Sequence, residues 1–194
     1  MKYFINEKFS AGLLLTGINT KSAEGKLIRS GVHSVTNHDG MTVTSGKLQG
    51  IAEAVPPRSR ITTLAEYEDL MNNKGYIVRL YRPTMLTQAE QKAAADAFTK
   101  CFIGARYPEK WKMTLLAMPI YNLFLDKTKH MPSMRLTWCS QLVKESYEIA
   151  KRGCLLRYDG HDKQLFTPRT FENRILQGLF LDVTDEIIGD TEKK

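Results

Sequence analysis

The run Thr137-Trp138-Cys139-Ser140-Gln141-Leu142-Val143 begins a predicted helix, with a cysteine in its first turn. Apolar and small residues then recur at three- and four-residue spacing, and the segment closes on Lys151-Arg152-Gly153, two basic residues and a glycine stop. A thiol at a helix N-terminus faces unpaired backbone N–H groups and the positive end of the helix dipole, and both favour the nucleophilic thiolate. This placement indicates a nucleophile; the alternative is a buried core cysteine.

Groups that could activate this thiol lie upstream. His33 stands in the segment 31–40, which ends in the tight-turn signal Asp39-Gly40, and further strands are expected over 41–45 and 47–55. Because a cysteine needs a base, and the base needs a third group to fix its ring, a histidine and a carboxylate on neighbouring strands suit this chemistry. We predict that Cys139 is the nucleophile, that His33 is the base and that Glu53 orients His33.

Strand alternation sets the faces of these residues. The first strand would place on one face His33, Val35 and Asn37, and on the other Ser34, Thr36 and His38. The later strand would place Glu53 on the face of Ile51 and Val55. Face matching therefore favours Glu53 as the group that orients His33, ahead of Asn37 or His38.

Three stretches together resemble the permuted NlpC/P60 cysteine hydrolases, the papain-like group often called YiiX-like. They are the His33 segment after 26–31, the run Ile51-Ala52-Glu53-Ala54-Val55-Pro56-Pro57, and Cys139-Ser140-Gln141-Leu142-Val143 with the later Thr167-Pro168. The histidine precedes the cysteine, as in the permuted branch. The resemblance spans roughly 12–185 and implies a papain-like NlpC/P60 fold, circularly permuted, with the same Cys139, His33 and Glu53 triad and with Tyr107 lining the pocket.

Two departures from the family bear on the substrate. The histidine strand continues with the polar run Ser34-Val35-Thr36-Asn37 where the family has aliphatic residues, and Gln141 stands where the family usually has glutamate. Both leave the proposed catalytic groups in place and leave the identity of the substrate open.

The pattern of elements predicts an α+β domain with an antiparallel sheet packed against helices. A single domain is expected over 1–188, and 189–194 should form a flexible tail. Helices are expected over 63–71, capped by Thr62 or Thr63, and from Thr87, where Glu90 completes a capping-box pattern. The expected strands cover 12–15, 32–55 as a hairpin or meander, 75–81, 155–158 and 179–183.

Cysteine and histidine usage argues against a metal or other cofactor. The chain has three cysteines, an odd number, which argues against a complete disulfide framework, and we assign Cys101 and Cys154 to packing. No Cys/His cluster has zinc-like spacing, since His33 and His38 would lie on opposite strand faces. His130 and His161 lie in polar stretches and are interpreted as solvated.

Neither apolar stretch predicts a membrane segment. Residues 11–18 are short and contain two glycines, so we expect a strand or loop there instead of a signal peptide, which favours a cytoplasmic or phage-associated protein over a secreted one. The run 113–125 is too short and too interrupted to span a bilayer. It predicts a core helix with a proline break; an apolar wall of the substrate groove, or a lid, is the alternative.

The formal charge of +7 favours polyanionic partners, among them cell-wall polymers, anionic lipids and nucleic acids. Arg58 and Arg60 are expected either to flank the cleft and attract a carboxylate-bearing substrate or to be solvated loop charges. No nucleic-acid-binding signature accompanies the charge. The sequence therefore predicts a thiol hydrolase for an amide bond, in peptidoglycan peptides or related small peptides. The alternatives are a lipid acyl hydrolase or acyltransferase, and a non-catalytic binding or structural module, for example of a phage particle.

Overall fold

A computed structural model describes residues 1–19, 21, 23–45, 48–107, 138–155 and 167–190. Its main feature is a six-stranded antiparallel sheet in the order β5-β4-β3-β2-β6-β7. The strands are β2 (Leu14–Asn19), β3 (His38–Ser45), β4 (Leu48–Glu53), β5 (Arg60–Thr63), β6 (Tyr76–Pro83) and β7 (Phe180–Asp182). A second, two-stranded sheet pairs β1 (Lys2–Phe4) with β8 (Ile188–Asp190).

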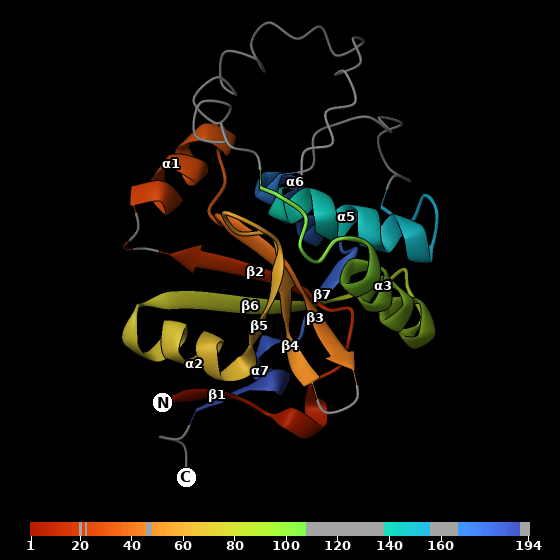
Figure 1. Ribbon diagram of the computed structural model, residues 1–194, viewed down its shortest axis with the longest axis horizontal. Coiled ribbons are helices and arrows are strands. Elements are labelled where there is room, and N and C mark those ends of the chain that lie inside the picture. The colour runs from red at the N-terminus through yellow and green to blue at the C-terminus, as the bar shows by residue number, and fades with distance from the viewer. Residues whose placement is uncertain (20, 22, 46–47, 108–137, 156–166, 191–194) are drawn as a thin grey trace, which may run out of the picture.

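Helices cover both faces of the large sheet (Figure 1). One face packs against α3 (Gln88–Cys101) and α5 (Cys139–Ala150), and the other against α2 (Leu64–Asn73) and α7 (Thr184–Ile187). The remaining helical elements are α1 (Ala23–Val32), α6 (Pro168–Leu176) and the 3-10 turn η1 (Asn6–Lys8). The chain is therefore a mixed α+β protein with an antiparallel sheet between helices, as expected.

Alternation along the strands builds two hydrophobic cores. At the start of β2, Leu14 faces the core under α3 and α5, whereas Leu15 and the preceding Leu13 face the core over α2. On β4, Ile51 and Ala52 divide between the two cores in the same way. Successive residues of a strand thus lie in different environments, which becomes important at the start of β3.

Several predicted elements are confirmed. Thr63 caps α2 and Thr87 caps α3, each with a complete capping box formed with the glutamate three residues later. The cysteine helix begins at Cys139, and the strands predicted near 75–81 and 179–183 are β6 and β7. The predicted features at 113–125, His130, His161 and 156–158 lie outside the described residues.

The structure corrects four expectations. The prediction that His33 lies on a strand is wrong, because 23–32 form helix α1 and β3 begins only at His38. Cys101 is exposed at the last residue of α3, so it is not a core residue. Gly189, expected in a flexible tail, pairs with Tyr3 in the small sheet. The strand expected over 12–15 is displaced along the chain, since β2 runs from Leu14 to Asn19.

Candidate active site

The thiol of Cys139 lies at the first residue of α5, and Trp138 is the N-cap. The cap has no side-chain hydrogen bond, and the first turn closes through the amide of Leu142, which donates to the carbonyl of Trp138 at 3.0 Å. Cys139 is buried against the face of the sheet that carries Met41 and Val43. A helix start directs its backbone N–H groups and the positive end of the helix dipole toward a negative charge that develops there.

His38, and not His33, stands beside this thiol. His38 begins β3 and Glu53 ends β4, and the two strands pair so that Gly40 lies opposite Glu53. Nε2 of His38 lies 2.6 Å from Oε2 of Glu53, and the side chain of Cys139 lies close enough to the imidazole to raise its pKa. The order thiol, imidazole, carboxylate is that of a catalytic triad.

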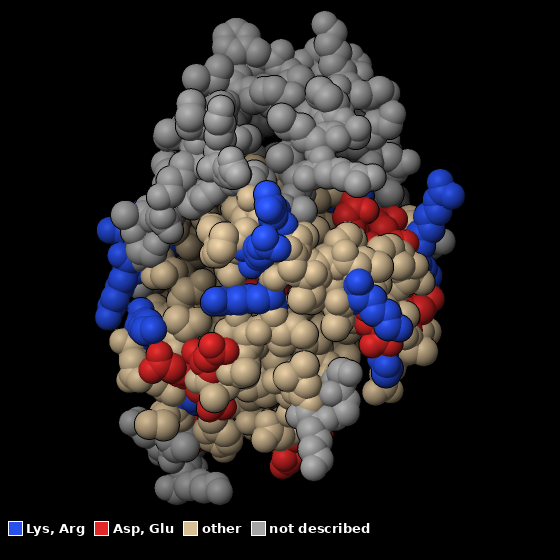
Figure 2. All heavy atoms as spheres, in the orientation of Figure 1, with Lys and Arg blue, Asp and Glu red and all other residues tan. Residues whose placement is uncertain are grey.

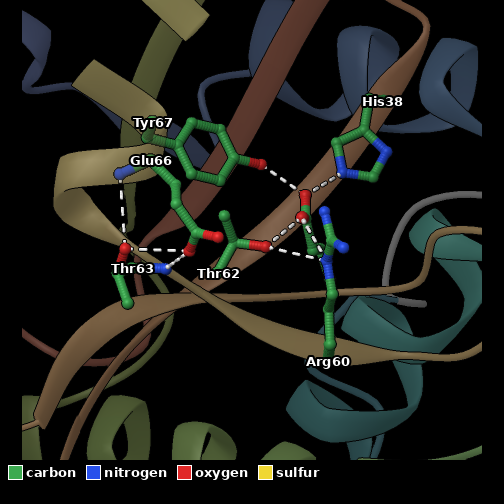
Figure 3. Close-up of polar contacts among 7 residues, drawn as sticks. His38, Arg60, Thr62, Thr63, Glu66 and Tyr67 are labelled. Atoms are coloured by element: carbon green, nitrogen blue, oxygen red, sulfur yellow. Dashed lines mark hydrogen bonds and ion pairs between the residues drawn. The ribbon is translucent and has the colours of Figure 1, made fainter. Parts of the chain in front are cut away.

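Four side chains converge on the carboxylate of Glu53, and Figure 3 labels all of them: His38, Arg60, Thr62 and Tyr67. Thr62 donates its hydroxyl to Oε1 at 2.5 Å, the phenol of Tyr67 donates to Oε2, and Nε of Arg60 lies 3.8 Å from Oε1. Tyr67 is buried on α2, whose capping box at Thr63 and Glu66 fixes the start of that helix. Thr62 and Arg60 thus contact Oε1, whereas Tyr67 shares Oε2 with the imidazole, so both oxygens of the carboxylate that orients the ring are fixed.

Electrostatics favour a charged pair at His38 and Glu53. Burial opposes ionisation of Glu53, but its contacts with His38, Thr62 and Tyr67 outweigh burial and lower its pKa to about 2. Burial also opposes the charged form of His38, yet the contacts with Cys139 and Glu53 raise the pKa of this imidazole well above its usual value. Burial, together with the nearby carboxylate, raises the pKa of Tyr67, which stays a hydrogen-bond donor.

The segment that precedes His38 is held by hydrogen bonds to α6 and to β2. Oε1 of Glu172, on α6, accepts hydrogen bonds from the hydroxyl of Ser34 at 2.6 Å, the amide of Thr36 at 2.8 Å and the hydroxyl of Thr36 at 3.0 Å. Toward β2, the amide of Asn37 donates to the carbonyl of Gly17 at 3.0 Å. These contacts hold the chain immediately before the imidazole.

His33 has a different structural role from the one predicted. Its φ of 50° is left-handed, and it directly follows α1. The amide of Ser34 then donates to the carbonyl of Arg29 at 3.1 Å, the contact of a Schellman helix end. His33 is exposed, and the Glu53 carboxylate contacts His38, so the predicted pairing of Glu53 with His33 is corrected. The strand faces assumed for this prediction do not exist, because 33–37 lie outside any strand.

The remaining predicted residues lie on two neighbouring segments. Tyr107 stacks edge-on against Trp138, with 6.2 Å between ring centroids, and its pKa is raised well above the usual value, mainly by burial and further by Cys139. The amide of Tyr107 donates to the carbonyl of Pro57, and Arg58 forms a β-bridge with Arg106. Arg58 and Arg60 are exposed, and Figure 2 shows Lys and Arg side chains on the face over which β5 runs in Figure 1.

Sequence reasoning missed His38 because the pair Asp39-Gly40 was interpreted as the end of a strand. In the structure both residues lie inside β3, and the alternation of buried Met41 and Val43 continues back through Asp39. The signal that could have identified His38 is this alternation, which places His38, Gly40 and Thr42 together on the opposite face, the face that Glu53 shares with Gly40.

Among the described residues, no group of three or more His, Cys, Asp or Glu side chains is arranged to hold a metal ion. Within the same part of the chain, no helix is both long and apolar enough to cross a bilayer.

Comparison with known proteins supports the fold. No family model and no curated protein matches the sequence. Among solved structures, the chain is similar to the metalloprotein YiiX from Escherichia coli O157:H7, with a TM-score of 0.60, 16% identity, and coverage of 91% of this chain and 97% of that chain. At this identity the likeness shows the fold alone. The chain therefore has the mixed α+β fold of YiiX, with an antiparallel sheet packed between helices.

Proposed function

We propose that this chain is a thiol hydrolase of the papain-like, permuted NlpC/P60 type that cleaves an amide bond. Cys139 is the nucleophile, His38 the acid–base group and Glu53 the residue that orients the imidazole. The observation that carries the proposal is the position of the His38 ring, which is bonded to Glu53 and lies close enough to the side chain of Cys139 for that thiol to raise the pKa of the imidazole. Thr62 and Tyr67 hydrogen-bond to the Glu53 end of this chain of contacts. Burying such polar groups costs free energy of folding unless each of them has a hydrogen-bond partner.

The chemistry follows from the order of the groups. Cys139 reacts as the thiolate, with its proton held by His38. The sulfur attacks the carbonyl carbon and forms a C–S bond, while the carbonyl oxygen takes the displaced electron pair and faces the N-terminus of α5. Protonated His38 gives its proton to the amide nitrogen, the C–N bond breaks and the amine leaves. Water, deprotonated by the now neutral imidazole, then releases the acid from sulfur.

The surroundings favour a peptide with negative charge as the substrate. Tyr107 and Trp138 supply aromatic surface next to the thiol, and the exposed Arg58 and Arg60 belong to the segments that meet Tyr107 or Glu53. Peptidoglycan peptides, which carry free carboxylates, and related small acidic peptides have this chemistry. The order of histidine before cysteine along the chain agrees with a permuted arrangement.

The test uses the purified protein with a set of synthetic peptides, including muropeptide-type substrates, and measures release of the new amine. Cys139→Ala should abolish release, while Cys101→Ala, which removes an exposed thiol at the end of α3, should leave it unchanged. Iodoacetamide should label Cys139 at a rate that His38→Gln lowers. A Cys139 that reacts no faster than Cys101, together with no turnover, would overturn the proposal and favour a non-catalytic module.

A further inference from the structure

A second pair of residues lies directly beside the candidate catalytic pair. Asp39 follows His38 on β3, and Ser140 follows Cys139 on α5. The hydroxyl of Ser140 donates to Oδ2 of Asp39 at 2.5 Å, and both residues are 0% exposed. The strand that carries the imidazole is thus tied to the helix that carries the thiol, one residue further along each chain.

The contact between Ser140 and Asp39 leaves a buried carboxyl group only partly hydrogen-bonded. Oδ1 of Asp39 is buried and has no hydrogen-bond partner in the part of the chain that the structure describes. Burial raises the pKa of this carboxyl to about 7, against the lowering effects of Ser140 and His38 and with a further increase from Glu172. A half-satisfied buried carboxyl destabilises a fold relative to an apolar pair of the same size, so packing alone does not account for it.

Ser140 also touches the nucleophile. Its oxygen lies 3.8 Å from the sulfur of Cys139. The hydroxyl proton of Ser140 is donated to Asp39, which fixes the rotation of the hydroxyl. The lone pairs of the Ser140 oxygen therefore face the thiol of Cys139. Asp39 therefore controls the orientation of a group in contact with the reacting sulfur.

We infer that Asp39 and Ser140 form a buried clip that keeps His38 and Cys139 in contact, with Asp39 acting as a positioning residue. The inference rests on the proposed function, because it assigns the clip to the reactivity of Cys139. The alternation of β3 suits this role: His38 and Asp39 point to opposite faces, so Asp39 contacts Ser140 in the first turn of α5 while His38 contacts Glu53.

The experiment measures the second-order rate of iodoacetamide with Cys139, located by mass spectrometry of the labelled peptide, at pH 6 and pH 8. Asp39→Ala and Ser140→Ala should each lower the rate about tenfold, the value of one well-made hydrogen bond, and the double variant should lower it no further. Asp39→Asn keeps an oxygen that accepts from Ser140 and should restore the rate to within about threefold of the unmodified protein. Thermal unfolding of each variant establishes that it is folded.

A matched control separates the clip from helix packing. Ser146 is also fully buried on α5, and its hydroxyl donates to the carbonyl of Leu142 within the helix. Ser146→Ala should leave the labelling rate unchanged. The clip is overturned if the losses from Asp39→Ala and Ser140→Ala are additive, or if these variants fold and label at unchanged rates. In either case, fast labelling of Cys139 that depends on His38 would still support the proposed function. Slow labelling of Cys139 that is insensitive to His38→Gln overturns both.

Discussion

Nε2 of His38 and Oε2 of Glu53 lie 2.6 Å apart, although 15 residues separate them along the chain. The hairpin of β3 and β4 creates this contact, because its register places Gly40 opposite Glu53 and leaves His38 two residues beyond, on the same face. Both side chains are buried, at 9% and 5% exposure, so the pair is shielded from water. A buried pair with its imidazole against a thiol is the relationship on which the predictions below rest.

Replacing the two histidines in turn distinguishes the structure from the prediction made from sequence. His38→Gln should lower peptide turnover about 10²- to 10⁴-fold, as expected for the loss of a general acid–base group. His33→Gln should leave turnover unchanged, because His33 is exposed and ends α1. The measurement is steady-state amine release for both variants. Loss of activity in His33→Gln alone would restore the original assignment.

The sequence predicted those elements whose local signals agree with one another. Thr63 and Thr87 each precede a glutamate by three residues, and both helices begin where this pattern places them. Cys139 and Glu53 were selected on residue type, placement and family resemblance, and the structure brings both to His38.

The sequence did not predict α1, and the error over the histidine follows from this. The segment 26–31, which contains serine and glycine, was interpreted as the lead into a strand, yet it lies inside the helix. A side chain at Gly25 would come within 2.3 Å of Nδ2 of Asn37, so the glycine is needed for tertiary packing that no local pattern shows. With α1 missed, the strand was predicted to begin at Val32 and to carry His33, whereas β3 begins at His38.

Glu53→Gln should lower stability in a pH-dependent way. The pKa of Glu53 is lowered from 4.5 to about 2, so the stability gained from its ionised form is complete above pH 4.5 and is lost as the pH falls through about 2. The pKa of His38 is raised, so its contribution is complete below pH 6.5 and is lost as the pH rises through the higher folded value. The variant should therefore lose about 3 kcal/mol between pH 4.5 and 6.5.

Urea unfolding of the protein and of Glu53→Gln across pH 2 to 9 measures this difference. The difference between the two stabilities should be largest between pH 4.5 and 6.5, should vanish as the pH falls through about 2, and should shrink as the pH rises above 6.5. Glu66→Gln serves as the control, since Glu66 is exposed and caps α2 without contacting the imidazole. A constant difference between Glu53→Gln and the unmodified protein at every pH would show that the charge of the pair contributes nothing.

Glu172 should control the placement of His38 through the preceding segment. Glu172→Ala removes the acceptor of three hydrogen bonds from Ser34 and Thr36 and should cost about 3 kcal/mol of stability, with slower labelling of Cys139. Arg169→Ala removes only the ion pair between Arg169 and Oε2 of Glu172. Because the Arg169 side chain is 48% exposed, this loss should cost less than about 1 kcal/mol of stability. Urea unfolding and iodoacetamide labelling provide the two readouts. Equal effects of both substitutions would contradict the role given to Oε1.

The charge of the substrate can be tested through Arg58. Exposed charges mainly raise the rate of encounter, and salt screens them over about 8 Å at physiological ionic strength. With an acidic peptide, kcat/KM should therefore fall as salt is added, and Arg58→Glu should lower it about threefold to tenfold at low salt and little at high salt.

Arg60 is unsuitable for this test because it contacts Glu53 directly. Arg152→Glu makes the same change of charge on an exposed residue beyond the far end of α5 and serves as the control. A matched neutral peptide should show a flat salt response with all three proteins. If the acidic and neutral peptides respond alike, the arginines do not select the substrate, and an uncharged amide or a lipid ester becomes the class to assay.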